Sequence, residues 1–146
     1  MSVQEAFAPV ARNTTIRMLL RFAAWVKAKV STSDQRGAFL ASDLEKNSEG
    51  ETKYVWMEPP PNFYSKDGKV YNVDGKGSTH LIRLSSSVYG LKIAANILYK
   101  LTKKNIENMG YTPSDHDDAV WFKFEEETGR WLIVSTWVDD HLMISS

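Results

Sequence analysis

The sequence predicts an α+β fold, in which helices cover one face of an antiparallel sheet and residues 1–146 form a single domain. Two helical stripes of apolar residues, at 16–24 and 91–101, are separated by short runs that favour strands. The strand and helix signals do not alternate regularly, which argues against a doubly wound parallel sheet. From residue 120 onward the strand signals follow one another directly, which predicts antiparallel hairpins.

The composition is typical of one globular domain inside a cell. Hydrophobic residues make up 42% and charged residues 25% of the chain, enough for a single core. We find no apolar run of membrane-spanning length and no signal-peptide pattern, so we expect an intracellular, cytoplasmic chain with no membrane partner. The absence of Cys excludes disulfides, thiolate metal ligands and cysteine nucleophiles.

The first predicted element is a core-facing helix that Thr14 or Thr15 can cap. Its apolar stripe consists of Ile16, Leu19, Leu20, Ala23 and Ala24, at helical spacing. Arg17 and Arg21 lie one turn apart on its flank, where solvent exposure is the simpler role and a phosphate contact the alternative.

A strand over residues 28–34 follows, because Val, Ser and Thr favour extended backbone. It is expected to end at Asp34, and a turn then leads into a short helical segment. Phe39 and Leu40 of that segment are available for packing. An Asp at a strand end is often only a cap, and that interpretation of Asp34 stays open.

The middle of the chain predicts two short strands, at 53–57 and 80–84, with a loop between them. The three prolines of 58–63 prevent the first strand from continuing. Residues 64–80 are expected to be a flexible loop. Its glycine-containing segment 75–79 does not have the spacing of a phosphate-binding P-loop.

A second amphipathic helix is expected to stop at Gly110, a suitable residue for a helix C-terminus. Its apolar positions are Leu91, Ala94, Ala95, Leu98 and Leu101. Three lysines in its C-terminal half, at 100, 103 and 104, are explained by the helix dipole alone. Residues 115–118 hold three Asp and are interpreted as a solvated loop.

Two adjacent carboxylates, Asp139 and Asp140, separate two apolar runs near the end of the chain, which predicts a tight hairpin with the acids at its tip. Charges about 4 Å apart repel by about 4 kcal/mol near a protein surface. The pair is therefore expected to be solvated, protonated or bridged by a cation. A structural Asp-Asp turn is the alternative.

Charge is sorted along the chain although the net charge is zero. Residues 59–104 are basic and residues 105–146 are acidic. This arrangement is compatible with a polyanion path beside an acidic metal site, whereas the neutral total argues against strong nonspecific nucleic-acid binding.

Several blocks of the sequence, in the same order, resemble the reverse transcriptase of copia-type LTR retrotransposons. These blocks are Glu5–Arg12 with Thr15–Arg17, Asp34–Leu44, Tyr54–Phe63, Arg83–Leu84 with Val88–Lys92, Met109–Thr112 and Val138–Asp140. The resemblance covers nearly the whole chain from Glu5, and the order of the blocks makes it more specific than the Asp-Asp turn alone.

The resemblance implies the palm of an RNA-directed DNA polymerase, with a ferredoxin-like sheet. Asp34, Asp139 and Asp140 match the family's catalytic triad and would bind two Mg²⁺ ions, for which Mn²⁺ is an expected substitute. Phe39 matches the nucleotide-binding aromatic that selects deoxynucleotides, although an ordinary core Phe is an equal alternative. The implied partners are an RNA or DNA primer-template, deoxynucleotides and the remaining polyprotein domains, with a virus-like particle as the location of an intact element.

The sequence departs from the family at Trp137, where Tyr is usual, at His141, where an apolar residue is usual, and at Ile93, where Gln is usual. Against the family pattern we expect an incomplete fingers region and no thumb. The isolated chain is therefore expected to be an inactive palm fragment of a transposable element.

Two other classes stay open. The chain could be a noncatalytic nucleic-acid-binding module that uses the basic region 59–104, or a structural remnant of a decayed or domesticated element. A two-metal nuclease is a weaker alternative, because it needs a general base near the acids and His141 is the available candidate.

Overall fold

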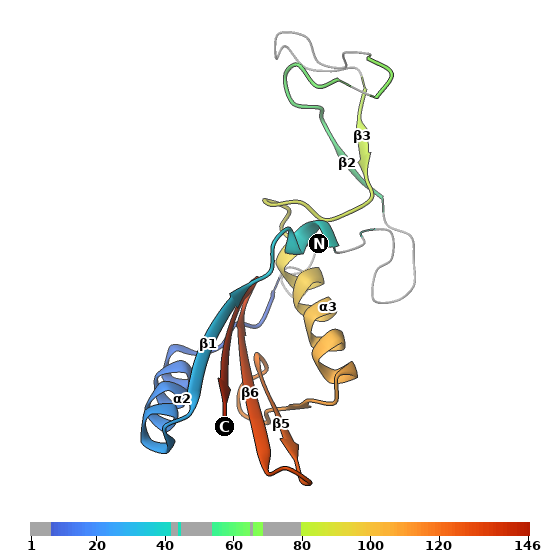
Figure 1. The fold of residues 1–146 in the computed structure, drawn as a ribbon. Helices are drawn as coiled ribbons and strands as arrows, with labels where there is room; N and C mark the ends of the chain where they lie inside the picture. Colours follow the sequence, from blue (N-terminus) through green and yellow to red (C-terminus); the bar gives the residue numbers. More distant parts are fainter. Residues whose placement is uncertain (1–6, 42–43, 45–53, 65, 69–79) are drawn as a thin grey trace. The chain divides into compact units, whose positions relative to one another are not determined.

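The computed structural model describes residues 7–41, 44, 54–64, 66–68 and 80–146. The chain forms two compact units (Figure 1). One unit is built from Met1–Ser42 together with Val88–Ser146, and the other is Asp43–Ser87. Most of the predicted loop at 64–80, including its glycine-containing segment 75–79, lies outside the described residues.

A five-stranded antiparallel sheet is the centre of the larger unit. Its strands are β1 (Lys29–Asp34), β4 (Thr112–Pro113), β5 (Val120–Glu125), β6 (Arg130–Trp137) and β7 (Asp140–Ser145). Their order across the sheet is β1-β7-β6-β5-β4, and all neighbours are antiparallel. The predicted α+β class, the strand end at Asp34 and the final hairpin are confirmed.

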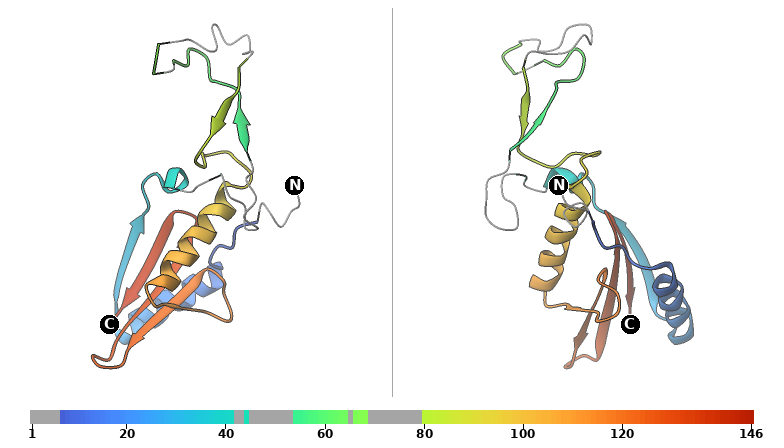
Figure 2. Two further views of the ribbon diagram at one scale, coloured as in Figure 1. Left: turned by 90° about the vertical axis from the view of Figure 1, so that its right-hand side faces the viewer. Right: turned by 180° about the vertical axis from the view of Figure 1, so that it is seen from behind.

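Each face of this sheet is covered by one helix, α2 (Asn13–Val26) or α3 (Ala94–Asn108). One core cluster joins Leu19 and Ala23 of α2 to Val120 and Ile144, and another joins Ile106 of α3 to Trp121 and Val134. Val120 and Trp121 are consecutive in β5 and therefore point to opposite faces. Figures 1 and 2 show the strands lying between the two helices. The prediction that the helices cover one face is wrong.

The helices cover both faces of the sheet because its strands are apolar on both sides. In β7, Leu142 and Ile144 face α2, while Met143 faces α3. A sheet with two apolar faces must be covered on both to remove them from water. One helix alone would leave half of this core exposed.

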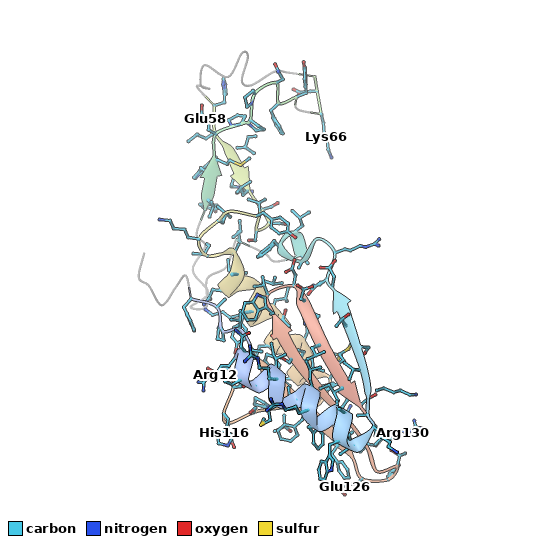
Figure 3. All side chains as sticks on the ribbon, turned by 90° about the vertical axis from the view of Figure 1, so that its left-hand side faces the viewer. Arg12, Glu58, Lys66, His116, Glu126 and Arg130 are labelled. Atoms are coloured by element: carbon cyan, nitrogen blue, oxygen red, sulfur yellow. The ribbon has the colours of Figure 1, made fainter. Side chains whose placement is uncertain are left out.

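The start of α2 is held by a residue that is distant in the sequence. The helix begins at Asn13, and its N-cap residue, Arg12, makes no side-chain capping bond. Instead the Arg12 N–H donates to Oδ2 of Asp117 at 3.0 Å, and the Thr15 side chain also bonds this carboxylate. Figure 3 shows Arg12 at the start of the helix, near the loop of His116. The predictions of a Thr cap and of a fully solvated acidic loop are therefore wrong.

Asp117 is buried, and its Oδ1 also accepts from the Ala119 N–H at 3.2 Å. Burial raises the pKa of a carboxyl group, but the hydrogen bonds from Thr15, Arg12 and Ala119 outweigh burial and lower the pKa of Asp117. The carboxylate is thus ionised in the folded chain and fixes the loop to the helix end.

The buried stripe of α2 is narrower than predicted, because Leu20 and Ala24 are exposed whereas Leu19 and Ala23 are buried. The predicted end of α3 is confirmed. Gly110 has φ +83°, its N–H donates to the Glu107 carbonyl, and the next N–H, of Tyr111, donates to Ile106. These two bonds satisfy the last carbonyls of the helix in the Schellman arrangement.

The smaller unit contains the antiparallel pair β2 (Val55–Met57) and β3 (Ile82–Leu84), which confirms the two predicted strands. Within this unit the Arg83 guanidinium lies 5.2 Å from the ring centre of Tyr54. In the described part of the chain, the helices are too short or too polar to cross a membrane.

Candidate active site

The sheet brings two distant acids directly opposite each other at one of its ends. Asp34, the last residue of β1, pairs with Asp140, the first residue of β7. Directly opposite residues have Cβ atoms about 4.5–5.5 Å apart and side chains on the same face. In Figure 1, β1 ends beside the turn between β6 and β7.

Asp139 is fixed to the same end through the backbone. The Gln35 N–H donates to the Asp139 carbonyl oxygen at 2.9 Å, so the residue after Asp34 bonds the residue before Asp140. The fold therefore brings together all three acids singled out from the sequence. The prediction of acids at the hairpin tip is confirmed for Asp139, whereas Asp140 already belongs to β7.

The turn that carries Asp139 has an unusual backbone. Trp137 pairs with Asp140, so Val138 and Asp139 form a two-residue loop, and Val138 has φ +59°. A β-branched residue rarely adopts this left-handed conformation, which costs on the order of 1–3 kcal/mol. Val138 packs against a core cluster that contains Phe39 and Leu98. Packing thus holds the strained turn, and with it the position of Asp139.

An open cavity of about 430 Å³ borders the two paired acids. Asp34, Asp140 and Trp137 line it, together with Ile16 of α2. Asp34 and Asp140 are both exposed, and Trp137 is 45% exposed. The acids are therefore accessible to a large solute, and the indole of Trp137 offers that solute an aromatic wall.

His141 is on the opposite face of the sheet from Asp140, since consecutive strand residues alternate. Burial lowers the pKa of its imidazole, and the charges of Asp140, Asp139 and Asp34 partly oppose this effect. All three carboxylates are thus close enough to act on one imidazole. His141 is nevertheless among the residues that line the cavity of the paired acids, so the alternation of faces does not exclude the nuclease alternative.

Carboxylate oxygens are the ligands that Mg²⁺ prefers, so the chemistry of the three acids suits this ion. The side chains, however, are not arranged as a binding site. Among the described residues, no three His, Cys, Asp or Glu side chains lie close enough together to hold a metal ion. The backbone thus brings the acids to one place without converging their oxygens.

Phe39 lies in the 3₁₀ helix η1 (Ala38–Ala41) and is only 7% exposed. Its ring meets that of Tyr89 at 4.5 Å between centroids, in an edge-to-face arrangement. Leu40, which was expected to pack, is 61% exposed. The exposed aromatic residue at this place is Tyr89, at 66%, which sequence reasoning had not singled out. Its position before Gly90 within a block of the resemblance was the available signal.

Comparison with known proteins decides the family. A family model described as reverse transcriptase (RNA-dependent DNA polymerase) matches residues 1–146. The chain belongs to this reverse transcriptase family. The sequence interpretation is therefore confirmed at the level of the family, and the match extends over both compact units.

Two curated relatives of this reverse transcriptase domain come from plants. It is 30% identical over 141 residues to the retrovirus-related Pol polyprotein from transposon TNT 1-94 of Nicotiana tabacum, covering 96% of this chain and 9% of that protein. It is also 30% identical over 140 residues to the retrovirus-related Pol polyprotein from transposon RE2 of Arabidopsis thaliana, covering 95% and 8%. The chain thus spans less than a tenth of the length of these relatives. No solved structure matched the chain significantly.

Proposed function

We propose that this chain is part of the palm of a copia-type RNA-directed DNA polymerase, which extends a primer with deoxynucleotides along an RNA or DNA template. The observation that carries the proposal is the pairing of Asp34 with Asp140, reinforced by the bond from Gln35 to Asp139. This pairing brings acids from two distant segments to one accessible end of a sheet. Family membership alone would not require that the acids meet in this chain.

In this proposal Asp34, Asp139 and Asp140 hold two Mg²⁺ ions, with Mn²⁺ as a substitute. When bound, the ions would lower the pKa of the primer hydroxyl and stabilise the charge that develops on the transferred phosphate. The chain's own contribution is to hold the three carboxylates at one end of the sheet. The strained turn at Val138 limits the freedom of Asp139, which favours a fixed position over a mobile one.

Phe39 is proposed to select deoxynucleotides by restricting the space beside the sugar. Its cluster includes Val138, which directly precedes Asp139, so the ring lies behind the proposed catalytic turn. Because Phe39 is almost fully buried, Tyr89 would make most of the direct contact and Phe39 would support it. Trp137 would bound the opposite side of the site, beside Asp140.

The isolated 146-residue chain is proposed to be inactive or nearly so, and the remaining polyprotein domains are its proposed partners. Support comes from the carboxylates of the described residues, which do not converge into a metal site. The same observation favours a second candidate, a noncatalytic nucleic-acid-binding or structural remnant.

Primer extension on an RNA template with Mg²⁺ or Mn²⁺ tests the proposal. The parent is compared with Asp34→Asn and Asp139→Asn, and with Asp115→Asn as a control that removes an exposed acid of the loop before β5. Gel filtration and circular dichroism first establish that all four are folded. If the chain polymerises, the two site variants lose at least about 1,000-fold in activity while the control is unchanged.

Equal activity in the parent and in Asp139→Asn would contradict the proposed roles of the acids. If a folded parent extends no primer, RNA binding across ionic strengths separates the remaining candidates. Binding that weakens steeply with salt and does not depend on Asp34 identifies a noncatalytic module. No binding at any ionic strength identifies a structural remnant.

A further inference from the structure

Four aromatic side chains form a continuous surface that joins α2 to the sheet. The Phe22 ring centroid lies 5.5 Å from that of Trp131 and 6.5 Å from that of Trp25. Phe124 is directly opposite Trp131 in the β5–β6 ladder, so these two side chains are neighbours on one face. We call Phe22, Trp25, Phe124 and Trp131 the aromatic surface.

Much of the aromatic surface is in contact with solvent. Trp25 is 81% exposed and Phe124 is 61% exposed, and Met18, one turn before Phe22, is exposed beside them. At about 150–250 Å² for each large apolar side chain, their exposed part amounts to roughly 400 Å². The largest apolar patch on a typical monomer is about 300–600 Å² and is often an interaction site. A stable complex buries about 800 Å² on each partner, with an apolar centre and a polar rim, so the aromatic surface has the size of such a centre.

The outer side of the aromatic surface, on α2, is basic. Arg21 is two residues before the buried Ala23, a rotation of about 200° around the helix, so Arg21 points away from the sheet. It is one turn before Trp25 and therefore lies beside that ring. Arg17, one turn before Arg21, is also exposed. Two arginines thus form the rim on this side.

The opposite side of the aromatic surface, at the turn between β5 and β6, is acidic. Glu126 and Glu127 follow the end of β5 and are exposed. Arg130 is directly opposite Glu125 in the ladder, so the charges of that pair offset each other. Figure 3 shows Arg130 and Glu126 beside the C-terminal end of α2. Two glutamates thus form the rim on this side.

A surface with a basic side, an aromatic centre and an acidic side is complementary to itself. If two copies are related by a two-fold axis through the centre, the basic side of each copy faces the acidic side of the other. A nucleic acid or an acidic peptide would instead meet the glutamates, so neither matches the whole surface. The formal net charge of zero also means that two copies do not repel each other at a distance.

We propose that the aromatic surface binds a second copy of this chain and forms a two-fold symmetric dimer. In this dimer Arg17 and Arg21 of each copy face Glu126 and Glu127 of the other, and the aromatic rings of the two copies pack between these charges. The occupant is a second copy because the charges of this surface match those of the same surface turned by half a rotation.

The proposed dimer leaves the candidate active site accessible. Trp131 is at one end of β6 and Trp137, which borders the cavity of the paired acids, is at the other end, about 20 Å away. The proposal therefore does not depend on polymerase activity, and a chain that extends no primer could still dimerise.

Sedimentation equilibrium of the full 146-residue chain, between about 1 and 100 μM, tests the dimer. We expect a monomer–dimer equilibrium with a Kd of about 1–10 μM, at the weak end for an interface of standard size. A chain that stays monomeric at the highest concentration would overturn the proposal. A continuous series of larger oligomers would also overturn it, because a two-fold contact closes at two copies.

A tryptophan substitution tests the centre of the interface. Trp25→Ser should weaken dimerisation at least about tenfold, because a tryptophan at the centre of an interface often contributes much of the binding energy. Trp56→Ser is the matched control, since it removes an exposed tryptophan of the smaller unit, and should leave the Kd unchanged. Circular dichroism establishes that both variants are folded. Equal Kd values for the two variants would contradict the proposed interface.

Charge reversal tests the two-fold arrangement without changing the aromatic surface. Arg21→Glu and Glu126→Arg should each weaken dimerisation at least about tenfold at low ionic strength, because the symmetry makes each like-charge contact occur twice. The double variant again places opposite charges face to face and should return to within about threefold of the parent Kd. A double variant that dimerises no better than the single variants would refute the arrangement, whatever the outcome for Trp25→Ser.

Discussion

The β6–β7 hairpin presents two chemically different faces at one end of the same sheet. On the α2 side, Asp140 and Trp137 border an open cavity with the paired acids. On the α3 side, His141 and Met143 line a mostly apolar cavity. Consecutive strand residues alternate, so a slip of one residue in pairing would exchange the two sets. The register of β7 against β1, more than the composition of the hairpin, therefore decides where each chemistry lies.

The largest expected loss of stability comes from a residue on the face of the sheet that α3 covers. Trp121 is fully buried in the cluster with Ile106 and Val134, so Trp121→Ala should lower the free energy of unfolding by about 3–5 kcal/mol. Phe122→Ala is the matched control on the other face, where the ring is 46% exposed, and should lower it by less than about 1.5 kcal/mol. Urea denaturation measures both, and equal losses would contradict the assignment of faces.

The attachment of α2 depends on one carboxylate. Asp117→Ala leaves the Arg12 and Ala119 N–H groups without their acceptor, and should lower the free energy of unfolding by about 2 kcal/mol at neutral pH. Asp118→Ala, the exposed neighbour, should change it by less than about 0.5 kcal/mol. If both variants lose the same stability, the acidic loop does not cap the helix.

The contribution of Asp117 should also depend on pH. Its pKa is lower in the folded chain than in the unfolded chain, so the stabilisation is fully present above the unfolded pKa, about 4. It is lost as pH falls through the folded pKa. The difference in unfolding free energy between the parent and Asp117→Ala should therefore be constant above about pH 5 and shrink below pH 4. A difference that grows on acidification would contradict this sign.

A smaller change in stability is expected at the C-terminal end of α3. Gly110→Ala forces a Cβ into a left-handed conformation with φ +83° and should lower the free energy of unfolding by about 1 kcal/mol. The new Cβ would make no steric clash, since its nearest neighbour, the Lys123 side chain, would lie at 3.7 Å, a normal van der Waals distance. Asn108→Ala, at the last helical residue, should change stability by less than about 0.5 kcal/mol. Thermal unfolding of both variants separates strain from a general loss of helix.

The smallest expected effect is an increase in the free energy of unfolding. His141→Leu removes Nδ1, a buried nitrogen with no hydrogen-bond partner among the described residues, and keeps an apolar side chain in its place, which should raise the free energy of unfolding by up to about 1 kcal/mol at pH 8. His116→Leu should leave it unchanged, because that side chain is exposed. A marked loss of stability in His141→Leu would show that the imidazole already has a bonding partner in solution.

Local patterns were sufficient to predict several parts of the fold. The end of β1 at Asp34, the hairpin before Asp140 and the termination of α3 at Gly110 all depend on residues close in sequence. The meeting of Asp34 with the Asp-Asp turn was not derivable from spacing. It was implied by the resemblance and is supported by the register of β1 against β7.

Other features depended on tertiary contacts that no local pattern contains. The side on which each helix packs could not be predicted, because Leu142 and Met143 make β7 apolar in both directions. Asp117 looked like an ordinary loop acid because its partner, Arg12, is 105 residues away. The burial of Phe39 likewise depends on α3, which contributes Leu98 to its cluster.

The pairing of Asp34 with Asp140 also sets the order of events while the chain is being made. β1 has β7 as its only neighbour in the described sheet, and more than one hundred residues separate the two acids. At about 5–20 residues per second, β1 leaves the ribosome roughly 5–20 s before its partner strand. The acidic cluster can therefore assemble only after β7 has been made, and a nascent chain that stops before β7 lacks the strand that pairs with Asp34.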